Sequence, residues 1–168
     1  MAHAVVRTDN LASTDVRGGE DLVSVRYQPS DTMTEIDNGN VVLLSGLEDG
    51  EREIYVGVTP AANSPIEDVV IITTPEVMYD ERLRNLDEWY NVAGKPARGS
   101  HFHRNDTFSV TKDALDGKSE PEVGDIVELK AGTKMNVAAS LTSGSTQIGT
   151  ILAIEQAGRY LFYVIKVD

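Results

Sequence analysis

Short segments of apolar or alternating residues, each bounded by turn-forming residues, recur along most of this chain. The segments are 22–27, 41–44, 53–58, 69–73, 125–130, 134–139, 148–155 and 159–167. A period of two places successive side chains on opposite faces of a strand, and such runs between turns are typical of strands. Gly and Asn at 37–40 and 48–50 readily adopt the positive φ angles of tight turns. The sequence therefore predicts a mainly β body, either a β-barrel or β-sandwich-like.

The last segment carries apolar side chains on both faces of the predicted strand. Tyr163 and Ile165 fall on one face together with Leu161, whereas Phe162 and Val164 fall on the other. This pattern predicts a strand buried on two sides, in a sandwich, in a closed barrel or against a neighbouring subunit.

One segment, 81–93, has helical periodicity. Leu83, Leu86 and Tyr90 recur at spacings of three and four. An aspartate precedes the segment as a possible N-cap, and a Gly-Lys-Pro sequence follows it as a stop signal. We expect one short helix here.

The chain length of 168 residues fits a single domain. Residues 1–20 are polar and rich in turn residues, which predicts an N-terminal arm, and 21–168 would form one β-rich domain. An alternative division treats 75–120 as a helix-and-loop insertion before a C-terminal β-barrel-like part, 121–168. A single extra turn is expected near 111–115.

The net charge of −12 argues against nucleic acid or an anionic membrane as a partner, because either would be repelled by the protein's own field. No cysteine is present, which excludes disulfides and thiolate metal sites. The N-terminus lacks the apolar region of a cleaved signal peptide, and no apolar run approaches about 18 residues. We expect a soluble protein that is not exported through such a signal.

The pattern His101-Phe102-His103, followed by Asp106, is the sharpest candidate for chemistry. On a strand both imidazoles would point to one side, and Asp106 could complete a two-histidine, one-carboxylate metal set similar to that of cupins. The spacings depart from the cupin pattern and no second motif is present. The competing interpretation places both histidines in a polar surface loop or subunit contact.

No serine-nucleophile elbow, phosphate-binding loop or dinucleotide fingerprint occurs in the sequence. Paired carboxylates are frequent, but most alternate with arginines on the predicted helix and are expected to form its solvated face. We therefore expect a protein that is not an enzyme and that uses no cofactor.

Two segments are candidates for a contact with a partner. The N-terminal arm is mildly apolar, and its residues His3, Val5, Val6 and Arg7 could add an edge strand to another chain. The segment 94–105 is predicted to be a loop and is the only locally basic stretch. Its residues Arg98 and Arg104 are interface candidates because arginine is favoured at interface cores. The alternatives are a disordered tail and a solvated turn.

Several stretches spread over nearly the whole chain resemble small head proteins of tailed phages of Gram-positive bacteria. They are MAHAVVRTDN at the start, IDNGNVV at 36–42, DGEREIY at 49–55, PEVMYDERLRNLDE at 75–88, AGKPARG at 93–99, VGDIVELKAGTK at 123–134 and the closing GRYLFYVIKV. The likeness lies in their number and order, since none is a mechanistic motif.

The resemblance implies a capsid decoration, or cement, protein. Such a protein is made in the host cytoplasm, binds the major capsid protein on the outer surface of the icosahedral head, and stabilises the expanded shell. It commonly binds as a homotrimer, with its N-terminal arm along the lattice, although some capsid-decorating proteins bind as monomers at hexamer centres. Two other functions stay open: another virion role, such as a head fibre base or tail-tube component, and a small cupin-like metal-binding β-barrel enzyme.

Overall fold

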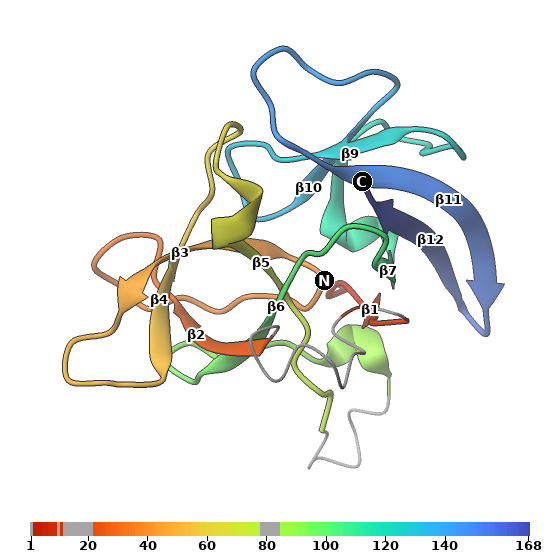
Figure 1. Ribbon diagram of the computed structural model, residues 1–168. Helices are drawn as coiled ribbons and strands as arrows, with labels where there is room; N and C mark the ends of the chain where they lie inside the picture. Colours follow the sequence, from red (N-terminus) through yellow and green to blue (C-terminus); the bar gives the residue numbers. More distant parts are fainter. Residues whose placement is uncertain (1, 10, 12–21, 78–84) are drawn as a thin grey trace.

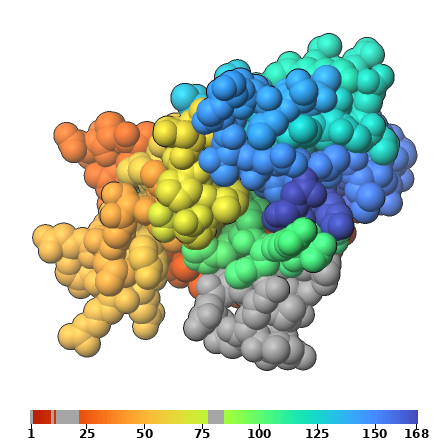
Figure 2. Space-filling model, turned by 45° about the horizontal axis from the view of Figure 1, so that its top comes forward, coloured from red at the N-terminus to blue at the C-terminus, as the bar shows by residue number. Residues whose placement is uncertain are grey.

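The structure is a computed structural model that describes residues 2–9, 11, 22–77 and 85–168. Strands make up 43% of the chain and helical turns 6%, so the predicted mainly β fold is confirmed. The strands form two sheets (Figure 1). Figure 2 shows the orange and yellow segments of the first sheet on one side of the molecule and the cyan and blue C-terminal segments on the other.

Five strands close into a barrel in the order β2-β4-β3-β5-β6. Their bounds are β2 Leu22–Tyr27, β3 Val41–Leu47, β4 Ile54–Val58, β5 Val69–Ile72 and β6 Ala97–His101. β2 runs parallel to β4, and the other neighbours are antiparallel. In a closed barrel every strand has two neighbours, so none of these five is a terminal strand of the sheet.

The fully buried part of the barrel interior is built from small or β-branched side chains among the described residues. Val25, Val42 and Val70 fill it, and all three are buried. A Cβ at Gly57 would lie 2.6 Å from Val25, and one at Gly99 would lie 2.7 Å from Val70. The two glycines therefore let the facing valines meet across the barrel.

The second sheet has seven strands in the order β1-β7-β12-β11-β9-β10-β8. Their bounds are β1 Val6–Arg7, β7 Thr107–Val110, β8 Leu115–Gly117, β9 Ile126–Glu128, β10 Met135–Ala138, β11 Gln147–Ala157 and β12 Tyr160–Val167. β8 is parallel to β10 and the other pairs are antiparallel. The predicted strand segments 125–130 and 134–139 contain β9 and β10, which pair as an antiparallel hairpin.

One core joins the barrel to the sheet. The four residues of β5 are fully buried, and they alternate between two environments. Val70 and Ile72 point into the barrel. Val69 and Ile71 lie outside the barrel, in the hydrophobic core that also contains Phe108 and Ile165. The uninterrupted apolar run of β5 thus reflects burial on both faces.

β12 is buried on both sides, as its sequence predicts. Tyr163 and Ile165 belong to the shared core, and Phe162 and Val164 on the opposite face are also buried. Leu161 is the exception, because 44% of its surface is exposed.

The helix expected at 81–93 does not form over its described part, 85–93. This part contains a single 3-10 turn, η2, at Leu86–Glu88, and Asn91 then makes an isolated β-bridge with Ile36. Residues 81–84 lie outside the described residues. The bridge, together with the buried amide of Asn91 that donates to the Ile36 carbonyl at 3.0 Å, holds the chain extended where the periodicity favoured a helix.

Two further expectations differ from the structure. The segment 94–105 was expected to be a loop, but it contains β6, a barrel strand. The closed barrel is formed by strands within 22–101, and 121–168 contributes to the open seven-stranded sheet instead. The short turn expected at 111–115 is present as η3, Lys112–Ala114, and another 3-10 turn, η1, spans Ile66–Asp68.

None of the helices in the described residues is long and apolar enough to span a membrane.

Candidate partner-binding site

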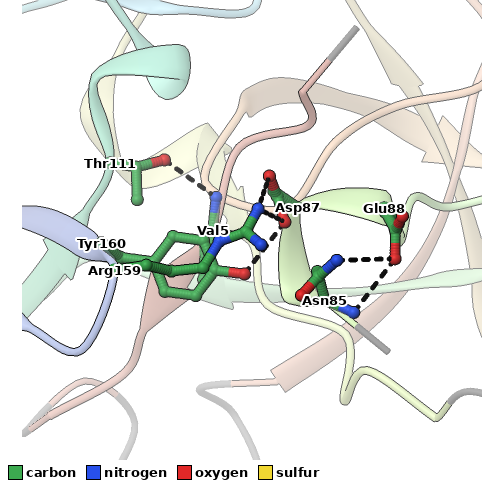
Figure 3. Close-up of polar contacts among 7 residues, drawn as sticks. All are labelled: Val5, Asn85, Asp87, Glu88, Thr111, Arg159 and Tyr160. Carbon is green, nitrogen blue, oxygen red and sulfur yellow. Dashed lines mark hydrogen bonds and ion pairs between the residues drawn. The ribbon is translucent and has the colours of Figure 1, made fainter. Parts of the chain in front are cut away.

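The first residues of the predicted arm pack on the protein's own body. Val6 and Arg7 form β1, which pairs antiparallel with β7 at one edge of the seven-stranded sheet. The Val5 backbone N–H donates to Thr111 Oγ1 at 3.1 Å, as Figure 3 shows. The side chains of Val5 and Val6 are buried and thus unavailable to another chain. Residues 12–20 of the predicted arm lie outside the described residues.

His3 is anchored just before this strand. Its Nδ1 lies 2.6 Å from Asp37 Oδ1, and its ring stacks on Tyr90 with centroids 4.7 Å apart. Its backbone N–H donates to the Asp87 carbonyl at 2.8 Å. His3 therefore ties the N-terminal segment to the region around η2.

Arg7 is engaged within the molecule. Its guanidinium donates to Glu155 at 3.0 Å and to Ser109 at 3.2 Å, and it lies 4.4 Å from the centre of the Phe162 ring. It also forms an ion pair with Asp9 at 3.8 Å. The sequence singled out Arg7 as a contact for a partner, and the structure places it as a bridge between β1 and the β11-β12 hairpin.

The tip of the β11-β12 hairpin is fixed to η2. Arg159 at the tip pairs with the Asp87 carboxylate at 2.6 Å, and the Tyr160 hydroxyl donates to it at 2.9 Å (Figure 3). Burial raises the pKa of Asp87, but the bonds from Tyr160 and Arg159 outweigh this and hold the pKa below its usual value. Figure 3 also shows Asn85 and Glu88 bonded to each other within this turn, which steadies Asp87.

The outer half of this hairpin is a two-stranded ribbon. β9 pairs with β11 only over Gln147–Thr150, and β7 pairs with β12 only over Tyr163–Lys166. Beyond these points the hairpin continues without a neighbouring strand in the described sheet. Figure 1 shows it extending away from the rest of the molecule.

Three exposed apolar residues lie on this ribbon: Leu152, at the register irregularity between Ile151 and Ala153, and then Ile154 and Leu161, which we call the hairpin face. These side chains are 56%, 37% and 44% exposed. Ile154 pairs with Tyr163, and Leu161 lies two residues from Tyr163, so both continue the buried face of the sheet. Sequence reasoning placed Leu161 on this face but expected burial. The sequence feature that could have predicted the exposure of Leu161 is the nearby Gly158-Arg159 turn. This turn lies at the end of the hairpin that extends beyond the neighbouring strands.

Arg98 is exposed on β6 and borders several hollows at the end of the barrel. One has a volume of about 700 Å³ and another a volume of about 370 Å³. Its backbone pairs with the chain at Thr73 and Thr74, while its side chain forms no ion pair among the described residues. Arg104 is also exposed, in the turn from His103 to Asp106, where Asn105 has a positive φ of 71°. Arg104 does not line any of the three hollows described here that border Arg98.

The three predicted metal ligands are not arranged as a metal site. β6 ends at His101, so His103 does not share its strand. The Asp106 carboxylate accepts the backbone N–H of His103 at 3.2 Å, which closes the turn between them. Among the described residues no group of three histidine, aspartate or glutamate side chains could hold a metal ion.

Comparisons with known proteins do not add a relative. No family model matches this chain, and neither the curated proteins nor the solved structures compared with it gave a match.

Proposed function

We propose that this protein is a non-enzymatic capsid decoration protein of a tailed phage. It binds the major capsid protein on the outer surface of the icosahedral head as a homotrimer and stabilises the shell. The resemblance of stretches spread over the chain to small phage head proteins supports this proposal. The net charge of −12 is consistent with it, because negative charge limits binding to nucleic acid.

The observation that carries the proposal is the exposed hairpin face. Ile154 and Leu161 continue the core face of the sheet into solvent on a ribbon without neighbouring strands. Exposed apolar residues that extend a buried face are typical of surfaces for another protein. The ribbon is also held in place, since Arg159 and Tyr160 fix its tip to Asp87. A rigid contact loses little conformational entropy on binding.

Many identical copies on a symmetric shell need only modest contacts each. When three linked subunits bind together, the later contacts form at high effective concentration, so the avidity exceeds the affinity of one subunit. A small apolar patch per subunit is then sufficient for stable decoration.

The test is co-sedimentation of purified variants with expanded, decoration-free capsids. We expect the double change Ile154→Ser and Leu161→Ser to lower the apparent affinity at least about tenfold, because it removes the apolar contact of every subunit. The matched control is Leu47→Ser, since Leu47 is 51% exposed but lies on the barrel strand β3. Equal binding by the hairpin variant and the wild type would contradict this assignment of the surface.

A further inference from the structure

A groove lies beside β1, on the side turned away from β7. Its volume is about 370 Å³. One wall of the groove is formed by β1 and the residues that follow it as far as Asp9. The segment 73–76 forms the other wall, and Arg98 also lines the groove. The larger hollow of about 700 Å³ and a smaller one of about 140 Å³ also reach Arg98. The volumes of about 370 and 700 Å³ fall in the range of about 300–1,000 Å³ that ligand sites occupy.

The backbone of β1 has an open edge toward this groove. The Thr111 N–H donates to the Val5 carbonyl at 3.0 Å, and Arg7 lies opposite Ser109. Main-chain bonding alternates along an antiparallel pair, so the N–H and C=O of Val6 point away from β7. β1 is the terminal strand of its sheet. An extended segment in the groove could therefore pair with Val6.

Arg98 offers one positive group in this groove to a carboxylate of an occupant. Asp9 is paired with Arg7 and accepts the Ser109 hydroxyl. The Glu76 carboxylate accepts the Asn38 amide at 2.9 Å. Asp9 is thus neutralised by Arg7, whereas Glu76 is bonded only to a neutral amide and keeps its charge. Arg98 is exposed and forms no ion pair among the described residues, so its guanidinium is available to a carboxylate. In a chain with 27 acidic and 15 basic residues, such an arginine is a marked positive feature.

We infer that this groove binds an extended peptide segment of a partner protein, with a carboxylate of that segment paired to Arg98. The segment adds to β1 through the backbone of Val6, as in β-strand addition. The carboxylate lies at Arg98, where the guanidinium can donate two parallel hydrogen bonds. Thr8 and Thr74 line the same space, and their hydroxyl groups can bond to the remaining polar groups of the segment. This inference does not depend on the capsid role.

The experiment uses the full chain, labelled with nitrogen-15, and a capped peptide probe in which one glutamate is flanked by valines and threonines. We expect saturable amide shifts at millimolar peptide that centre on Val6, Thr74 and Arg98. A second peptide with glutamine in place of the glutamate should bind at least about fivefold more weakly, because it lacks the charge-assisted pair.

Two variants locate the interaction. Arg98→Gln should weaken binding of the glutamate peptide by the same factor and leave binding of the glutamine peptide nearly unchanged. Arg104→Gln is the control, since Arg104 is an exposed arginine outside the groove. The inference is overturned if no saturable shifts occur, if they centre away from the groove, or if the two peptides bind equally. These results are independent of capsid co-sedimentation, so failure of one proposal does not imply failure of the other.

Discussion

At the scale of single residues, one glycine in β11 has no room for a side chain. A Cβ at Gly149 would overlap the carbonyl group of Lys166 on β12. Gly149→Ala is therefore expected to force the strands apart and to lower the free energy of unfolding by at least about 1–3 kcal/mol. Gly132→Ala is the control, because no atom lies within 4 Å of the added Cβ. Urea unfolding of both variants measures the difference, and equal stability would contradict the tight β11-β12 approach.

A second residue, Glu128, makes stability depend on pH. Its carboxylate is buried and accepts bonds from Asn136 at 2.7 Å and from the Thr142 hydroxyl and backbone N–H at 2.6 and 2.8 Å. Burial raises the pKa of Glu128, but the bonds from Thr142 and Asn136 outweigh it, so the pKa lies below the usual 4.5. The stabilisation is complete above pH 4.5 and is lost as the pH falls through the folded-state pKa.

Glu128→Gln tests this pH dependence. We expect the variant to lose about 1–3 kcal/mol of unfolding free energy at neutral pH, because the charged bonds are removed. The difference in unfolding free energy between the variant and the wild type should become smaller as the pH falls below 4.5. Thermal unfolding at several pH values measures it, with the exposed Glu53→Gln as control. A gap that is constant across pH would show that the Glu128 carboxylate has an ordinary pKa.

At the scale of elements, β1 is part of the folded body. Ala4, Val5 and Val6 are buried, and β1 pairs with β7. Deleting the N-terminus would thus disturb the core, so a loss of partner binding in such a deletion would not identify an arm. Point variants that keep the strand are the better probes.

Val5→Ala measures how firmly β1 is held. We expect it to lower the free energy of unfolding by about 1–3 kcal/mol, because it removes buried methyl groups and leaves a cavity. Thr8→Ala should change stability little, since Thr8 is exposed. If chemical denaturation gave the same stability for Val5→Ala and the wild type, the N-terminal segment would be detached in solution.

The sequence predicted the elements whose side chains are large and apolar, and it missed those whose packing requires small ones. β5 and β12 were evident from runs such as 69–72 and 160–167. β6 was not, because the interior positions Ala97 and Gly99 of a narrow barrel carry almost no side chain and leave no apolar alternation. The expected helix at 81–93 had the right periodicity, but the Ile36-Asn91 bridge, a contact between distant parts of the chain, overrides it.

The candidate site was predictable in part for the same reason. Arg98 was identified from its charge, which the sequence displays directly. The hairpin face was not, because the exposure of Leu161 depends on where β7 and β9 end beside the hairpin. The sequence predicts Val5 and Val6 as contacts for a partner, whereas they are buried in the protein's own body, because an apolar N-terminus does not indicate which chain covers it.

At the scale of the whole molecule, the barrel and the seven-stranded sheet share one core. Val41, Val69 and Ile71 of the barrel pack with Phe108 and Ile165 of the sheet. The Val41 N–H also donates to the Thr133 carbonyl at 2.7 Å across the junction. A partner that binds the hairpin face therefore contacts a single rigid unit, which suits a protein that stiffens a shell.

The most direct test of the central claim is co-sedimentation of the wild-type protein with expanded, decoration-free capsids and, in parallel, with unexpanded shells. The account predicts saturable binding at a fixed ratio to the major capsid protein on expanded capsids, with much weaker binding to unexpanded shells. Protein that stays in the supernatant with expanded capsids at every concentration would contradict the decoration role.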